Sequence, residues 1–201
     1  EGYLSEIEKD VRKEYVVANE ARKKGIDLVD SVEIPLARSM AEKSVGLIST
    51  LYPEIPLDDI TSRMIELEKK HGQLDTAVSF LIAKEIAEEK FCKFENQMQA
   101  IDCGIRVGFA YITLGVVASP IEGYTGITVK KRKDGGEYWC ANFSGPIRSA
   151  GTTATCLVLM LIDFLRENFG YGKYDPTEEE IKRYITENTD YHERVTNLQY
   201  F

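Results

Sequence analysis

Apolar residues recur at helical spacing along most of the chain, with charged residues between them. In the first such run Leu4, Ile7 and Val11 fall on one face, which is the pattern of an amphipathic helix that covers a core. The same periodicity predicts further helices, at residues 36–50, 58–71, 74–86, 96–118, 152–168 and from 176 onward. Asp175 is expected to cap the helix that starts at Pro176, and Thr189 or Asp190 is expected to cap a last helix. The pattern therefore predicts a mainly α-helical fold.

Two of these segments are apolar nearly all round. Residues 96–118 carry apolar side chains on several faces, and residues 157–162 are an unbroken apolar run. We expect the first segment to be the central core helix and the second to belong to a helix that is buried on all sides. Gly104, Gly108 and Gly115 lower helix propensity, and their spacing indicates that a neighbouring element packs closely there.

One segment has a β pattern. Residues 126–132 and 137–143 flank the turn sequence Lys-Asp-Gly-Gly, and Asp-Gly between two such runs indicates a hairpin. Because an isolated hairpin is marginally stable, it must pack on the helices. The expected fold class is mainly α (α+β), with a small β element centred on the strands of Val129 and Trp139.

Length and composition fit one folded region. Of the 201 residues, 43% are hydrophobic and 29% are charged, which is an ordinary globular balance. The expected organisation is one domain, residues 1–201, with helices at 1–118, a β-hairpin at 125–143 and C-terminal helices at 150–201. The net charge of −8 argues against a free-standing DNA-binding domain, although a local patch can still contact DNA.

Metal, membrane and secreted classes are not favoured. None of the four cysteines belongs to a Cys-x-x-Cys pair, so we expect reduced thiols and no structural zinc. Asp58 and Asp59 open a predicted helix, where acidic side chains complement the helix dipole more often than they bind metal. The longest apolar stretch, residues 107–118, is too short to span a bilayer, so we expect a cytoplasmic protein without membrane contact. A chain that starts without Met and stops at Phe201 also fits part of a longer protein.

The loop Ser144–Gly151 is the most informative local feature. Glycines let a backbone approach a ligand, amides at a helix N-terminus attract anions, and Arg148 and Ser149 add donors, so a phosphate or nucleic-acid backbone contact is reasonable. The loop lacks the Gly-Lys-Ser/Thr ending of a Walker A loop and the spacing of a dinucleotide fingerprint. The alternative is a strand-to-helix turn in which Arg148 is buried and ion-paired. We favour this structural role, because loop glycines more often serve backbone geometry.

A basic run lies at the predicted hairpin tip and consists of Lys130, Lys131, Arg132 and Lys133. It is either a contact for the DNA backbone or a solvated edge that prevents strand-on-strand aggregation. Tyr138 and Trp139 on the partner strand could stack on bases, but packing on the core is the commoner role. We expect no catalytic residue in the chain, because no clustered site is found.

Several short segments stand out together: Asp30–Ala37, Val117–Gly123, Phe143–Gly151, Tyr174–Glu178 and Tyr191–Tyr200. In this order and spacing they resemble the N-terminal part of the large subunit of the archaeal family D DNA polymerase, also called DNA polymerase II. The match covers nearly the whole chain. The family continues the Gly/Ser loop with a second glycine where this chain has Thr152, which weakens a phosphate-cradling role for the loop.

The resemblance implies a replicative DNA-directed DNA polymerase that works with a small subunit carrying a proofreading 3′-to-5′ exonuclease. In that family the catalytic aspartates of the large subunit lie far downstream in a double-psi barrel, and none maps onto this chain. Magnesium is expected for the parent polymerase, where two metals activate the primer hydroxyl. No cofactor is expected in the region itself.

Two roles for this region remain open. In the first it is a scaffold and assembly domain that contacts the rest of the large subunit, the small subunit or another copy. In the second it is an accessory DNA-contacting module that uses Arg148 and the basic run at the hairpin tip. The acidic net charge and the apolar helices favour the first role. The isolated chain is expected to have neither polymerase nor nuclease activity.

Overall fold

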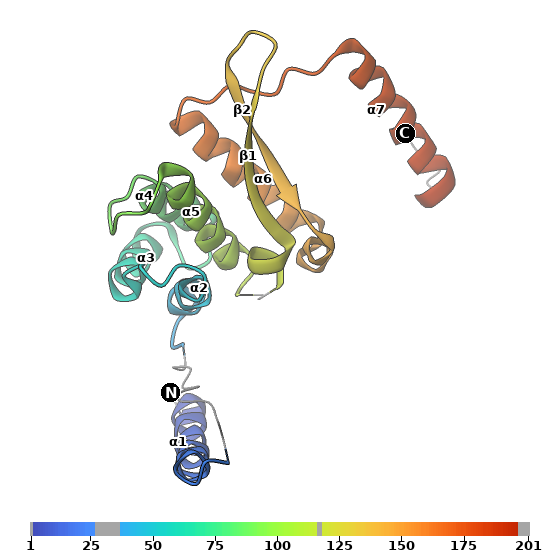
Figure 1. The fold of residues 1–201 in the computed structure, drawn as a ribbon. Helices are drawn as coiled ribbons and strands as arrows, with labels where there is room; N and C mark the ends of the chain where they lie inside the picture. The colour runs from blue at the N-terminus through green and yellow to red at the C-terminus, as the bar shows by residue number, and fades with distance from the viewer. Residues whose placement is uncertain (1, 27–36, 116–117, 197–201) are drawn as a thin grey trace.

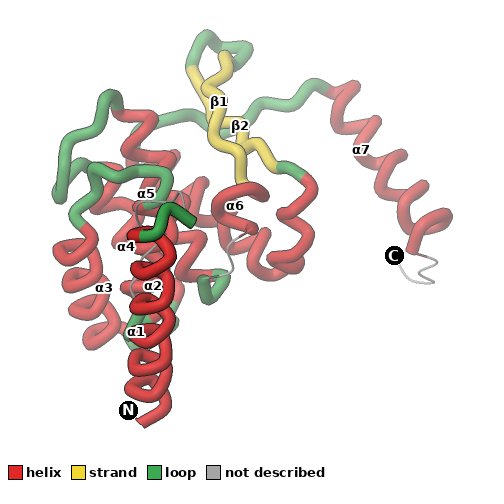
Figure 2. The backbone as a smooth tube through the Cα atoms, turned by 60° about the horizontal axis from the view of Figure 1, so that its bottom comes forward, coloured by secondary structure: helices red, strands yellow, loops and turns green. Residues whose placement is uncertain are grey.

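The computed structural model describes residues 2–26, 37–115 and 118–196. In this part of the chain α-helices dominate, and the β structure is one two-stranded antiparallel sheet. The helices and strands are α1 (Gly2–Lys23), α2 (Met40–Ser49), α3 (Leu57–His71), α4 (Thr76–Ala87), α5 (Gln97–Ile112), β1 (Tyr124–Lys131), β2 (Glu137–Phe143), α6 (Gly151–Asn168) and α7 (Glu178–Tyr191). The expected class, mainly α with a small β-hairpin, is confirmed (Figures 1 and 2).

Helix α5 is the centre of the packing, as the sequence predicts. Residues 103–111 are all buried. A side chain at Gly104 would place its Cβ 2.4 Å from the carbonyl oxygen of Ala83, and one at Gly108 would lie 3.0 Å from the Ser79 hydroxyl. The two glycines therefore let α4 lie directly against α5, which confirms the close approach inferred from their spacing.

Two hydrophobic clusters lie on opposite sides of α5. One side packs against α2, α3 and α4, around buried residues such as Ile48, Ile60 and Met64. The other side packs against the hairpin and α6, around Phe109, Trp139 and Leu161. Figure 1 shows this arrangement, with α2 and α3 on one side of α5 and the strands and α6 on the other.

The hairpin forms at the residues where the sequence predicts it. Val129 pairs with Trp139, and the strands are joined by a turn in which the amide of Arg132 donates to the carbonyl of Gly136 over 2.8 Å. Trp139 is only 8% exposed, and its ring lies 5.0 Å from that of Tyr171. Packing on the core, rather than stacking on bases, is therefore the role of Trp139 in this structure.

Helix α6 is not buried on all sides, so that expectation is wrong. Val158 and Leu161 face the core, but Leu159 is 44% exposed and Met160 is 59% exposed. The elements of the described chain cover only one side of this helix. The other side of α6, with Leu159 and Met160, is exposed.

The start and the end of α7 also differ from the expectation. Asp175 does not cap the helix, because its carboxylate accepts the backbone amide of Lys133 over 2.8 Å. Thr177 is the cap, and it forms a capping box with Glu180. Thr189 does not start a new helix, because its hydroxyl donates to the carbonyl of Ile185 and α7 continues to Tyr191.

Helices α1 and α7 project from the packed body of the molecule (Figures 1 and 2). Arg38, just before α2, donates to Glu8 of α1 over 2.8 Å. The start of α2 is capped by Ser39, later than the expected start at residue 36, and residues 30–36 of the segment Asp30–Ala37 lie outside the described residues. No helix in the described ranges is long and apolar enough to cross a membrane.

Candidate functional site

Two of the segments that carry the family resemblance pack against each other at the base of the hairpin. Residues Ser119–Gly123 form a π-helical turn, and residues Gly145–Ala150 form a 3-10 helix that leads into α6. A Cβ at Gly123 would lie 2.8 Å from the backbone nitrogen of Ile147. The amide of Ser144 donates to the carbonyl of Gly123 over 2.8 Å. The first turn therefore needs glycine at position 123, because the second turn lies directly on it.

The π-helical turn Ser119–Gly123 is bound by Arg106 of α5, which is 9% exposed. Its guanidinium donates to the carbonyls of Pro120 and Tyr124 over 2.7 and 3.0 Å. Its Nε donates to Asp102 over 2.7 Å, and its Cζ lies 4.9 Å from the centre of the Tyr124 ring. One buried cation thus fixes the backbone at the entry to β1.

Asp102 also links this cluster to the loop after α2. The hydroxyl of Tyr52 donates to the Asp102 carboxylate. Burial raises the pKa of both Tyr52 and Tyr124, and the neighbouring Asp102 carboxylate raises it further because it opposes a second negative charge. Both tyrosines are therefore neutral over the ordinary pH range, and the Tyr52 hydroxyl donates to Asp102 as a structural contact.

Sequence reasoning missed this cluster, although a signal for it was present. Asp102 and Arg106 are the charged residues within the predicted core helix, and they are spaced i, i+4. Residues at this spacing are neighbours on a helix. A charge pair inside an apolar helix must be satisfied locally, so the pair could have been predicted to hold an adjoining loop.

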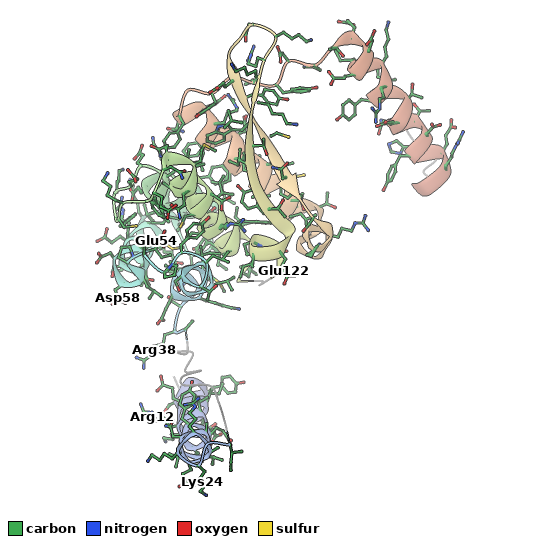
Figure 3. The ribbon with its side chains drawn as sticks, viewed as in Figure 1. Arg12, Lys24, Arg38, Glu54, Asp58 and Glu122 are labelled. Atoms are coloured by element: carbon green, nitrogen blue, oxygen red, sulfur yellow. The ribbon has the colours of Figure 1, made fainter. Side chains whose placement is uncertain are left out.

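Arg148 is exposed and, among the described residues, takes part in no ion pair. The expectation that it is buried and paired is therefore wrong. Ile147, which packs against the cluster around Trp139 and Leu161, anchors the loop instead. Ser149 lies in the same 3-10 helix, but its side chain is outside the described part of the structure. Figure 3 labels Glu122, which marks the neighbouring turn at the base of the hairpin.

The basic run at the hairpin tip divides into two pairs. Lys130 and Lys131 are exposed. The guanidinium of Arg132 donates to the carbonyl of Lys173 over 2.7 Å, and the ammonium of Lys133 donates to the carbonyl of Pro176 over 2.8 Å. Arg132 and Lys133 therefore hold the segment before α7, while the first two lysines are available for other contacts.

The described residues contain no group of three or more His, Cys, Asp or Glu side chains placed to hold a metal ion. Of the cysteines, Cys103 is buried and Cys156 is exposed, and all four are free thiols. Burial raises the pKa of the Cys103 thiol. In the described structure Cys103 is thus an apolar core residue, as expected of a buried thiol.

The chain is similar in sequence to several known proteins. Several relatives that are each 38–40% identical to this chain are described as "DNA polymerase II large subunit". The protein of Nanoarchaeum equitans is 39% identical over 198 residues, which is 98% of this chain and 16% of the relative. That of Thermoplasma acidophilum is 40% identical over 201 residues, 100% of this chain and 17% of the relative.

The chain therefore falls among the large subunits of DNA polymerases. Over residues 2–201 it matches the family described as "DNA polymerase II large subunit DP2, N-terminal", and it belongs to that family. The chain spans less than a fifth of the length of the relatives it matches. The resemblance inferred from the five sequence segments is thus confirmed.

Proposed function

We propose that this region is the N-terminal scaffold and assembly part of the large subunit of a DNA-directed DNA polymerase. Membership of the large-subunit family supports the class of enzyme. The exposed apolar faces of α6 and α7 support the assembly role, because exposed apolar patches on folded proteins commonly mark protein–protein contacts. The net charge of −8 also favours a protein partner over the phosphate backbone.

The observation that carries the assembly role is the outer face of α6. Leu159 is 44% exposed and Met160 is 59% exposed, next to the exposed Cys156. Residues 152–162 contain no charged side chain. Burying this apolar surface against a partner would contribute about 1.5–3 kcal/mol of free energy for each large side chain that becomes fully buried.

A comparison of the intact enzyme with the isolated chain tests this role. Changing Leu159 and Met160 together to Ser should leave the melting temperature of the isolated chain within a few degrees of the unchanged protein, because both residues are already exposed. In the complete polymerase the same change should weaken subunit association or lower the melting temperature. Asn168→Ser, at the exposed C-terminal end of the same helix, is the control. Unchanged association and melting of the complete enzyme would refute the assembly role of this face.

In this proposal the chemistry of synthesis belongs to the parent enzyme. The parent is proposed to polymerise DNA with Mg²⁺, in a heterodimer with a small subunit that carries a 3′-to-5′ exonuclease, and this region contributes no catalytic group. Primer-extension and exonuclease assays of the isolated chain with Mg²⁺ or Mn²⁺ should therefore give no product. Activity that disappears on changing one of its own carboxylates would contradict the proposal.

The exposure of Arg148, Lys130 and Lys131 favours a second candidate role, an accessory contact to DNA. In the complete enzyme Arg148→Gln should then weaken DNA binding equally for all sequences. The slope of log affinity against log salt should fall by about one for each lost phosphate contact. The melting temperature should not change, because the side chain is exposed. An unchanged salt slope for the triple Gln variant of these residues would exclude this role.

A further inference from the structure

Helix α7 has an apolar face that nothing in the described structure covers. None of its 14 residues is buried. Ile181 is 40% exposed, Tyr184 is 67% exposed and Ile185 is 64% exposed, and they share one face at i, i+3, i+4 spacing. Figure 1 shows α7 set apart from α6 and the strands.

A helix of this length needs a partner to be stable. Isolated helices shorter than about 12–15 residues are marginal in water, and helices in proteins are stabilised mainly by packing of an amphipathic face. The capping box of Thr177 and Glu180 fixes where α7 begins, but one cap contributes only about 1 kcal/mol. Packing of the exposed apolar face against a partner would therefore supply the stability that α7 lacks by itself.

The segment before α7 holds the helix in a defined position. The backbone amide of Lys133 donates to the Asp175 carboxylate over 2.8 Å, and the amide of Gly172 donates to the carbonyl of Glu137 over 2.8 Å. The rings of Tyr138 and Tyr174 lie 5.1 Å apart. The hairpin tip thus fixes the base of α7 and presents the helix away from the body.

The charges beside the apolar face restrict the partner. At 100° per residue, Glu180 and Glu187 border the face beside Tyr184, while Glu178 and Lys182 border it beside Ile185, so the charge beside the face is mainly acidic. A complementary surface is an apolar groove with a basic rim. A second copy of α7 packed antiparallel on this face would place Glu180 and Glu187 opposite the same residues, and such like charges repel.

We propose that α7 docks through this face onto a later part of its own polypeptide, in an apolar groove with basic side chains at its rim. This inference rests on the proposed assembly function. The family corresponds to the N-terminal part of the large subunit, and more than four-fifths of each relative lies outside the matched region. A groove on the same chain is tethered to α7, so its effective concentration is higher than that of a separate partner.

Site-specific photocrosslinking in the complete two-subunit polymerase tests the proposal. A benzophenone amino acid replaces Tyr184 on the apolar face, and in the control enzyme it replaces Arg183, which lies on the opposite face and is 77% exposed. Mass spectrometry of the irradiated enzyme should find the Tyr184 probe attached to the same large-subunit chain, beyond residue 201. The Arg183 probe should give little or no such product. Mixing of isotope-labelled and unlabelled large subunits distinguishes attachment within one chain from attachment to a second copy.

A second variant links the crosslink to the apolar face. Changing Ile181 and Ile185 together to Ser, in the enzyme that carries the probe at position 184, should lower the yield of the intrachain product about tenfold, which corresponds to a loss of about 1.4 kcal/mol of docking free energy for the two apolar contacts together. Thr186→Ser on the other face should leave the yield unchanged. These variants alter exposed side chains, so they do not depend on the packing of the body.

Three outcomes would overturn this inference. They are attachment of the Tyr184 probe to the small subunit, attachment to a second large subunit, and a Tyr184 probe that gives no more intrachain product than the Arg183 probe. Attachment to the small subunit would leave the proposed assembly function intact and refute only the choice of partner. The assembly function itself fails on the separate test, if the Leu159 and Met160 variant leaves the complete enzyme unchanged.

Discussion

Helices α3 and α7 carry the same kind of apolar pattern in opposite surroundings. In α3 the side chains of Ile60 and Met64 are completely buried against α2 and α4. In α7 Ile181 and Ile185, at the same i, i+4 spacing, are 40% and 64% exposed. Both helices begin with acidic residues in the first turn, which suits the helix dipole.

The difference teaches what periodicity measures. The spacing of apolar residues reports that a helix has one face to bury, and it is the same whether the partner is a neighbouring helix or another part of a larger assembly. The packed body, α2 to α6 with the hairpin, contains the partners of α3. The described residues do not contain the partner of α7, so the two regions should respond differently to the same substitution.

The largest contrast is expected between two arginine–carboxylate pairs at i, i+4 spacing. Arg106→Met in the body should lower the free energy of unfolding by about 3–5 kcal/mol, because Asp102 and the carbonyls of the first turn lose a buried partner. Arg183→Met, which breaks the exposed pair with Glu187 at 2.6 Å, should change stability by less than about 1 kcal/mol. Denaturant unfolding of the chain measures both. Similar losses for the two variants would show that the body and α7 do not differ as described.

Truncation of buried and exposed isoleucines should give the next largest contrast. Ile60→Ala leaves a cavity in a closed cluster and should cost about 2–5 kcal/mol. Ile185→Ala removes an exposed side chain and should cost no more than about 0.5 kcal/mol in the isolated chain. If the isolated chain loses as much on Ile185→Ala as on Ile60→Ala, then α7 is packed in solution and the comparison is broken.

The glycines of the body give a smaller, steric contrast. Gly104→Ala places a Cβ 2.4 Å from the Ala83 carbonyl oxygen, so α4 and α5 must move apart and stability should fall by about 1–3 kcal/mol. At Gly46 of α2 the nearest atom to a Cβ is the Leu57 Cδ1 at 3.7 Å, an ordinary contact. Gly46→Ala should therefore stabilise the chain by about 0.5–1 kcal/mol through helix propensity. Thermal unfolding should show melting temperatures that shift in opposite directions.

The smallest effect is expected at the start of α7. The backbone amide of Thr177 and the hydroxyl of Tyr174 donate to Glu180 and hold the pKa of that carboxyl below its usual value of 4.5. Because the folded pKa is depressed, the stabilisation is complete above the unfolded pKa and is lost as the pH falls through the folded pKa. The same contact raises the pKa of Tyr174 to about 12, chiefly through its hydrogen bond to Glu180.

The NMR signals of the α7 amides should therefore show fraying of the helix as the pH falls below the pKa of the Glu180 carboxyl in the unfolded chain. The signals of the α5 amides should remain unchanged. Thr177→Ala should cost the helix about 1 kcal/mol at neutral pH. Glu180→Gln should remove most of the pH dependence, and Glu179→Gln should leave it in place. A pH dependence that survives Glu180→Gln would place its origin elsewhere in the chain.

Local signals in the sequence predicted most elements of the fold. The position of the hairpin, with Val129 and Trp139 on its two strands, follows from an Asp-Gly turn between two β runs. The close approach at Gly104 follows from glycines inside an apolar helix. The position of the α7 cap was wrong by two residues, since Asp175 is bonded to Lys133. That bond joins residues distant in the sequence, so no local pattern reports it.

The candidate site was predicted less well. The loop at Arg148 was correctly identified as the junction between the hairpin and an apolar helix, but its anchor is Ile147 and Arg148 is exposed. Arg132 and Lys133 were assigned as candidate DNA contacts, and the structure places their side chains on the carbonyls of Lys173 and Pro176. Whether Lys130 or Arg148 contacts DNA stays a prediction.

The sequence by itself determined where the helices and the hairpin form, because periodicity, caps and turn residues act within a few positions of one another. Only the tertiary structure decided which charges are satisfied internally, as with Arg106 and the two turns at the base of the hairpin. It also decided which apolar faces remain open, since α3 finds its partners within the body and α7 does not. Burial of a side chain depends on which other residues surround it in space. The spacing of apolar residues along the sequence does not identify those neighbours for α3 or for α7.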